Sequence, residues 1–169
     1  MPLVSLDLLP DDARLWIFGA ERRLSPSERT VLLTEVDRFL ADWKAHGTPL
    51  TAARALSDDR FLMVAVDQAS VPPSGCSIDA MVDVLKDVQR SLGVGLVGHG
   101  ALYYRDPAGE VVRVDRATFR SRVEAGEVDG DTRVFDTTLT SLGGVRSGRW
   151  ERPARESWHG RAFLCPPAR

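Results

Sequence analysis

The chain has 169 residues, of which 43% are hydrophobic and 27% charged, an ordinary composition for a folded globular domain. Its 22 basic and 24 acidic residues leave a net charge of −2 at pH 7, which excludes the overall positive field of a dedicated nucleic-acid binder. Two cysteines, Cys76 and Cys165, are too few for a disulfide framework. Neither a signal-peptide pattern nor an apolar run long enough to span a membrane is found, so we expect a cytoplasmic protein.

The first predicted elements are a buried strand and an amphipathic helix. Residues 13–19 form a short apolar run closed by a glycine, which is typical of a buried strand. Residues 25–28 (Ser-Pro-Ser-Glu) have the spacing of a capping box with proline at the first helical position. Apolar residues then repeat at helical spacing, which predicts a helix over 26–45 that ends at residues 46–47 (His-Gly).

Two more strands, a second helix and a fourth strand follow. Residues 50–56 and 60–66 flank a turn-forming Ser-Asp-Asp triplet, which predicts a hairpin whose second strand is apolar on both faces. Helical spacing predicts a helix over 77–92, which Gly93 ends. Residues 101–104 are typical of a further strand.

This order of elements, β-α-β-β-α-β, predicts a mixed α/β (α+β) fold of the ferredoxin-like kind. We expect the first and third strands to be parallel neighbours, with both helices on one face of the sheet. The predicted core domain covers residues 1–105, and a C-terminal extension covers 106–169. The extension carries a predicted strand at 111–114, a helix at 116–125, a strand at 132–138 and an arginine-tryptophan tail.

The apolar third strand needs a cover on both faces. Residues 1–93 carry a net charge of −4 and residues 94–169 a net charge of +2, so the two parts attract each other. This complement favours the tail as the cover of the second face. A dimer partner is the alternative, so the chain is expected to be a monomer or a homodimer.

Four parts of the sequence resemble an uncharacterised bacterial family: residues 13–17 (ARLWI), 43–47 (WKAHG), Asp67 after the third strand, and 74–79 (SGCSID). Its members are small cytoplasmic proteins sometimes labelled as ABC transporter ATPases, and the resemblance covers about the first half of the chain. It implies no settled function. The ATPase label does not fit, because the sequence has no Gly-x-x-x-x-Gly-Lys-Ser/Thr loop and its only two lysines fall inside predicted helices.

Two loops are predicted to form an anion site. In the ferredoxin-like arrangement the loops after the first and third strands lie at one end of the sheet, beside both helix N-termini, whose free N–H groups favour an anion. The candidate ligand-binding residues are Arg22, Arg23, Asp67, Ser74, Gly75, Cys76 and Ser77. The alternative is that Ser77 only caps its helix, Gly75 turns the chain and the arginines are solvated.

Cys76 is also the candidate catalytic residue of a thiol-dependent enzyme. A thiol at a helix N-terminus beside arginines is a good nucleophile, but it usually needs a base. His46 and His99 are expected at the opposite end of the sheet, and only His159 could reach it from the tail. A structural cysteine is the alternative.

The tail offers a third hypothesis, an RNA- or ribosome-associated accessory protein. Phosphate contacts and base stacking could come from Arg149, Trp150, Trp158 and His159. The alternative is that these residues only cover the sheet. Three scattered histidines and two distant cysteines have no metal-ligand spacing, and no cofactor is expected. The sequence therefore favours a non-catalytic binding or regulatory protein whose partner is another protein or a small anionic ligand.

Overall fold

The computed structural model describes residues 3–69 and 71–164, and the chain forms two compact units. Unit 1 comprises Met1–Val97 and Thr138–Arg146, and unit 2 comprises Gly98–Thr137 and Ser147–Arg169. Both units mix helices with antiparallel sheets, in agreement with the predicted α/β class. None of the described helices combines the length and the apolar character that crossing a membrane requires.

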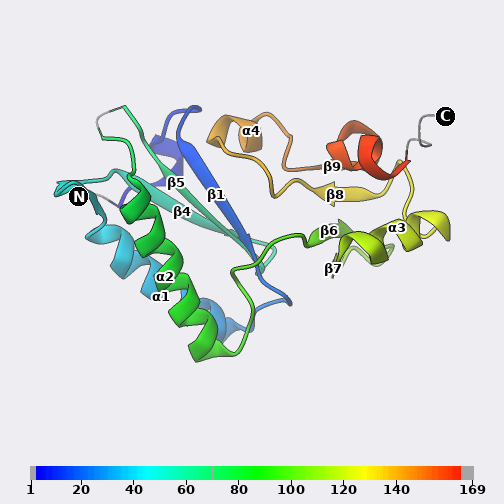
Figure 1. The fold of residues 1–169 in the computed structure, drawn as a ribbon, viewed down its shortest axis with the longest axis horizontal. Helices are drawn as coiled ribbons and strands as arrows, with labels where there is room; N and C mark the ends of the chain where they lie inside the picture. The colour runs from blue at the N-terminus through cyan, green and yellow to red at the C-terminus, as the bar shows by residue number, and fades with distance from the viewer. Residues whose placement is uncertain (1–2, 70, 165–169) are drawn as a thin grey trace. The chain divides into compact units, whose positions relative to one another are not determined.

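The main sheet of unit 1 is antiparallel and has the order β1-β5-β4 (Figure 1). It consists of β1 (Arg14–Gly19), β4 (Ala52–Ser57) and the central β5 (Phe61–Val66), whose residues are all buried. The predicted hairpin and the predicted neighbours β1 and β5 are confirmed. The parallel direction is wrong, because Arg14 pairs with Val66 and Gly19 with Phe61.

The direction of β5 follows from the path of the chain. Helix α1 (Pro26–Ala41) returns the chain to the end of the sheet where β1 starts, so β4 runs in the same direction as β1. A tight turn, in which Asp58 and Asp59 both have positive φ angles, then reverses the chain into β5. The predicted fourth strand does not join this sheet, so the complete ferredoxin-like arrangement is not found.

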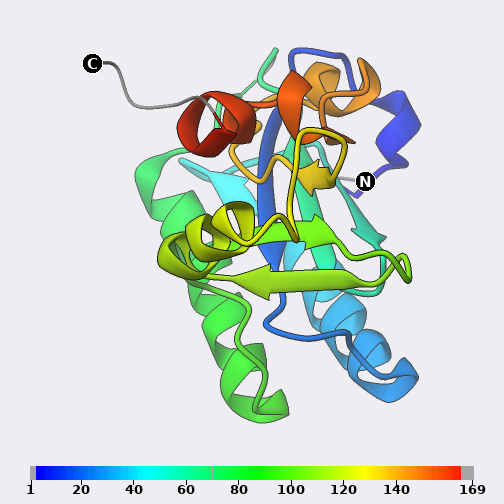
Figure 2. The same ribbon diagram turned by 90° about the vertical axis from the view of Figure 1, so that its right-hand side faces the viewer.

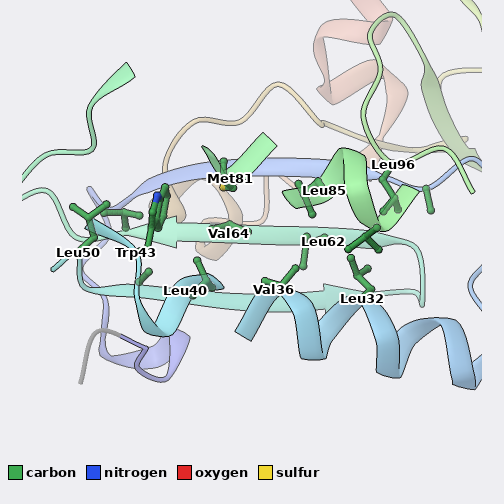
Figure 3. Packing of buried hydrophobic residues seen from close by; sticks show 14 of the residues in the cluster. Leu32, Val36, Leu40, Trp43, Leu50, Leu62, Val64, Met81, Leu85 and Leu96 are labelled. Atoms are coloured by element: carbon green, nitrogen blue, oxygen red, sulfur yellow. The ribbon is translucent and has the colours of Figure 1, made fainter. Parts of the chain in front are cut away.

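Helices α1 and α2 (Gly75–Leu92) cover one face of the sheet, as predicted (Figures 1 and 3). Figure 3 shows Val36 of α1 and Leu85 of α2 pointing toward Leu62 and Val64 of β5. The residues of β5 that alternate with these, among them Met63, are buried as well.

Each helix starts at a capping box. A serine before the first turn accepts from the N–H of the residue three positions later, and the side chain of that residue accepts from the N–H of the serine. In α1 the box joins Ser25 and Glu28, as predicted. In α2 it joins Ser74 and Ser77, so this helix begins two residues before its predicted start. Gly93 ends α2 in the left-handed conformation, as predicted.

Helix α1 ends four residues before its predicted end. Strands β2 (Lys44–Ala45) and β3 (Thr48–Pro49) form a short hairpin there. Its two turn residues, His46 and Gly47, have φ angles of 51° and 78°. Two successive positive φ angles are typical of a type I′ hairpin turn, so these residues reverse a strand instead of ending a helix.

Unit 2 has a four-stranded antiparallel sheet in the order β7-β6-β8-β9. Figure 2 shows the pair formed by β6 (Leu102–Arg105) and β7 (Val111–Val114), with helix α3 (Arg116–Glu124) following β7. Beyond them lie β8 (Arg133–Phe135) and β9 (Glu151–Pro153). The predicted boundary after residue 105 falls in the hairpin between β6 and β7, whereas the units divide after Val97.

The arginine-tryptophan tail has secondary structure of its own. Residues 147–164 belong to unit 2, where they form β9 and two single-turn helices, η2 (Ala154–Glu156) and η3 (Gly160–Leu164). A separate segment of unit 1 contains α4 (Leu142–Arg146). Another short turn, η1 (Leu6–Leu8), precedes β1. Cys165 lies outside the described residues.

Candidate functional site

The antiparallel pairing of β1 and β5 separates the predicted site residues into two groups. Arg22 and Arg23 follow the end of β1, whereas Asp67 and residues 74–77 follow the end of β5. Because the two strands run in opposite directions, their ends lie at opposite ends of the sheet. The predicted convergence of all these residues on one anion is therefore wrong.

Arg22 and Arg23 instead lie beside the β4–β5 turn, where they line a cavity of about 440 Å³. Its lining combines the loop after β1, the start of α1 and one residue of the turn. We call it the arginine pocket, and its residues are Arg22, Arg23, Leu24, Ser25, Pro26, Arg29 and Asp59. Three guanidinium groups therefore surround one cavity, although only two of them were predicted.

Each arginine of the pocket is paired with a carboxylate. Arg22 makes a two-pronged contact with Glu28, at 2.8 and 3.0 Å. Arg23 Nη2 donates to Asp59 Oδ2 at 3.0 Å, and Arg29 Nη1 donates to Oδ1 of the same carboxylate at 2.6 Å. Three guanidinium groups are thus paired with the carboxylates of Glu28 and Asp59, and the charge of Glu21 also acts on Arg22.

These contacts hold both carboxylates in the ionised form. The hydrogen bond from Arg22, followed by the one from the backbone N–H of Ser25, lowers the pKa of Glu28 to about 2. Hydrogen bonds from Arg23 and then Arg29 lower the pKa of Asp59. The charges of the pocket are therefore constant over the physiological pH range.

Buried backbone contacts fix the loop that carries the arginines. The guanidinium of Arg60, a residue only 8% exposed, donates to the carbonyls of Ala20 and Glu21 at 3.0 and 2.7 Å. The N–H of Leu24 donates to the carbonyl of Asp59 at 2.9 Å. Glu21 also exchanges two hydrogen bonds with the backbone of Gly95. The arginine pocket is thus preorganised by the fold.

The chemistry available in the pocket is that of binding. Arginine has five N–H donors and no acceptor, and it stays protonated at any physiological pH. The hydroxyl of Ser25 already accepts from the N–H of Glu28, and Asp59 is held by two arginines. Both groups are thus already engaged, whereas the exposed side chains of Arg22 and Arg23 have N–H groups left for an anion.

The second group of predicted residues lies around the start of α2. Ser74 and Ser77 satisfy each other through the capping box, and the carboxylate of Asp67 accepts from the N–H of Ala69 at 2.9 Å. Cys76 is exposed in the first turn. The alternative in which these residues serve capping and turn formation fits these contacts, and a reactive Cys76 stays a prediction.

His46 does not lie where the sequence predicted it. Trp43, two residues after α1, donates its indole N–H to the carbonyl of Ser77 at 2.8 Å. This contact holds the β2–β3 hairpin, which includes His46, at the end of the sheet where α2 starts. His46 and Cys76 are therefore at the same end of the sheet, which corrects the prediction that they are at opposite ends.

The aromatic residues of the tail pack inside unit 2. Trp150 packs on Phe135, with their ring centroids 5.3 Å apart. Trp158 stacks on His159 at 4.0 Å and donates its indole N–H to Asp136 at 3.2 Å. Since His159 is fully buried, it cannot stack on a nucleic-acid base. Of the predicted tail residues, Arg149 is exposed.

His159 is held in a neutral state. Its Nδ1 lies 2.9 Å from the hydroxyl of Ser157, whereas its Nε2 has no hydrogen-bond partner among the described residues. Burial, opposed by the charge of Asp136 and assisted by that of Arg116, lowers its pKa from 6.5 to about 4. His159 is therefore a histidine of the core of unit 2.

Unit 2 has a smaller cavity of about 320 Å³ lined by charged residues of both signs. Two of these, Arg105 and Arg133, share the carboxylate of Glu151. Within residues 3–69 and 71–164, no three His, Cys, Asp or Glu side chains gather as a metal site.

The comparisons with known proteins yield no relative. No protein-family model, no curated protein and no solved structure matches this chain. The resemblance to the bacterial family thus stays a prediction, and function has to be argued from the arginine pocket and the surfaces of the chain.

Proposed function

We propose that the chain is a non-catalytic binding protein whose arginine pocket takes an anionic group, a carboxylate or a phosphate, of a small ligand or a partner protein. The observation that supports this proposal is the meeting of Arg22, Arg23 and Arg29 around one cavity of about 440 Å³. Guanidinium groups bind both anions through paired N–H donors. The hydrogen bonds from the buried Arg60 to the carbonyls of Ala20 and Glu21 keep the loop of the pocket in place without a ligand.

Asp59 indicates how such an anion is held. Its two oxygens accept from two different arginines, which is the arrangement that a bound carboxylate or phosphate uses. The side chains of Arg22 and Arg23 are 52% and 66% exposed, so an incoming anion can reach them from solvent. The positive end of the α1 dipole adds to their attraction, because α1 begins at the pocket.

The test is the thermal stability of the protein in phosphate, in sulfate and in sodium chloride of equal ionic strength. An anion present at a concentration ten times its dissociation constant stabilises the folded state by about 1.4 kcal/mol. The melting temperature is expected to rise in phosphate or sulfate and not in chloride, which corrects for general screening. The double variant Arg22→Ala/Arg23→Ala is expected to lose this response.

A matched control is Arg38→Ala. Arg38 lies on α1, the helix whose start lines the pocket, and pairs with Glu35, but it does not line the pocket itself. This variant is expected to respond to phosphate as the unmodified protein does. If the unmodified protein shows no anion-specific rise, or if the double variant keeps the whole rise, the proposed function is refuted.

A further inference from the structure

A second set of arginines, in unit 2, has a different environment. Arg116 and Arg120 are one helical turn apart on α3. Their guanidinium carbons lie 5.0 and 5.2 Å from the centroid of the same ring, that of Phe163 on η3. Arg116 also lies 5.9 Å from the ring of Trp158. Two positive charges thus share one aromatic support.

These arginines have no carboxylate partner among residues 3–69 and 71–164, in contrast to those of the arginine pocket. Asp115, next to Arg116, is engaged elsewhere, since its carboxylate accepts from the N–H of Thr118 at 2.7 Å and caps α3. Glu124 lies one turn after Arg120 on α3, but these two described residues form no ion pair. Like charges held close together without a counter-charge repel each other. The pair is therefore arranged to receive an anion from outside.

The aromatic support orients both side chains. Phe163 is 7% exposed and belongs to the second core with Phe119, so its position is fixed. A guanidinium that lies over an aromatic face keeps its N–H groups, which lie in its own plane, free for hydrogen bonds. The two arginines of α3 are thereby presented as donors at little further entropic cost.

One more arginine extends this surface on the neighbouring element. Arg161 is on η3, two residues before Phe163, and α3 packs against η3. It is exposed and has no carboxylate partner in the described part of the chain. Arg113 of β7 points to the opposite face of the sheet, because Val112 and Val114 on either side of it contact the core beneath α3. We call Arg116, Arg120 and Arg161 the arginine face.

We propose that the arginine face binds the phosphodiester backbone of a nucleic acid without regard to sequence. Several unpaired guanidinium groups on adjacent elements match a ligand with a phosphate at every residue better than a ligand with one phosphate. The rings do not add base stacking, because Phe163 is buried and Trp158 is stacked on His159. This inference does not rest on the proposed function of the arginine pocket.

The experiment is fluorescence anisotropy of labelled 20-nucleotide single-stranded and double-stranded DNA at 50 to 200 mM salt. Each phosphate contact contributes a slope of about −0.7 for a single strand in a plot of log K against log salt. Two to three contacts predict a slope of about −1.4 to −2.1 and a loss of affinity of about 7- to 18-fold over this range. The double variant Arg116→Gln/Arg120→Gln is expected to reduce the magnitude of the slope by about 1.4.

The matched control in the same unit is Arg155→Gln, because Arg155 is also exposed but pairs with Asp131. It is expected to bind as the unmodified protein does, and so is the Arg22→Ala/Arg23→Ala variant of the other unit. The variant Arg116→Lys/Arg120→Lys keeps both charges and most of the slope, which separates loss of charge from loss of packing.

Three results would overturn the proposal. The first is no binding of either DNA at 50 mM salt. The second is equal weakening by Arg155→Gln and by the double Gln variant, which would indicate nonspecific attraction. The third is competition by polyglutamate as effective as by unlabelled DNA, which would indicate an acidic protein as the partner.

Discussion

Burial of the neutral His159 makes the stability of unit 2 depend on pH. Burial is the largest of the effects that lower its pKa from 6.5 to about 4. The charge of Asp136 opposes this shift, and the charge of Arg116 adds to it. In the unfolded chain the imidazole binds a proton below about pH 6.5, whereas in the folded chain it does so only below about pH 4. Acid therefore stabilises the unfolded state first.

The size of this effect follows from the interval between the two pKa values. The contribution of His159 to the free energy of unfolding is fully present above pH 6.5. As the pH falls below 6.5 it decreases by about 1.4 kcal/mol per pH unit, and near pH 4 it is lost. The total loss is about 3 kcal/mol, which is a large fraction of the stability of a small domain. Below pH 4 both states bind the proton and His159 adds no further slope.

The assay is urea unfolding of the unmodified protein and of His159→Asn between pH 7.5 and 4, followed by tryptophan fluorescence. Trp16 and Trp43 of unit 1 are replaced by Phe in both proteins, so that only Trp150 and Trp158 of unit 2 contribute to the signal. Asparagine can retain a polar atom near Ser157 but does not titrate. The variant loses volume in the core and is less stable at neutral pH. This deficit is expected to shrink by about 3 kcal/mol as the pH falls, because only the unmodified protein loses the contribution of the neutral imidazole.

Taking the difference between the two proteins cancels the titration of the carboxylates they share. A deficit that stays constant within about 0.5 kcal/mol from pH 7 to pH 4.5 would refute the reasoning, because it would mean that His159 titrates alike in both states.

Three further predictions concern separate positions. Gly160→Ala is expected to destabilise unit 2 by about 1 to 3 kcal/mol in urea unfolding, because a Cβ there would lie 2.5 Å from a backbone oxygen. The control Gly98→Ala, whose Cβ meets nothing within 4 Å, should change stability by less than about 1 kcal/mol, and equal effects of the two variants would contradict the packing. Arg116→Gln removes a positive charge that lowers the pKa of His159, so this pKa should rise in an NMR titration, and an unchanged value would place the charge elsewhere. Cys76 is exposed, so native protein should be alkylated there by iodoacetamide and Cys76→Ser should keep its melting temperature; protection of the thiol would contradict its exposure.

Local signals in the sequence predicted the secondary structure well. The capping box at Ser25 and the stop at Gly93 were predictable because each depends on residues within one turn of helix. The His46-Gly47 pair misled for a physical reason. A positive φ angle is needed both after a helix and in a tight hairpin, so the same residues fit both and only the contact of Trp43 with α2 decides.

The candidate site was half predictable, because it depends on pairing over a long range. Arg22 and Arg23 were identified, but the direction of β5 brings them to Asp59 and not to residues 74–77. Asp59 belongs to a Ser-Asp-Asp triplet that predicts only a turn, and no local signal in the sequence distinguishes Arg29. The composition of the tail, rich in arginine and tryptophan, likewise does not show that its aromatic residues pack in a core while some of its arginines stay exposed without a carboxylate partner in the described part of the chain.

The discontinuity of unit 1 sets a constraint on the order of events during synthesis. Strand β1 lies at an edge of its sheet, and its open side is bound by a segment more than a hundred residues later, where the N–H of Leu15 donates to the carbonyl of Thr140 and Arg14 bridges to Ser141. On the ribosome, this edge stays unprotected until residues 138–146 have emerged, after nearly all the strands of unit 2 have been made. An exposed edge is a template for pairing with other chains. Nascent chains stalled before residue 138 are thus the species that a chaperone would have to protect.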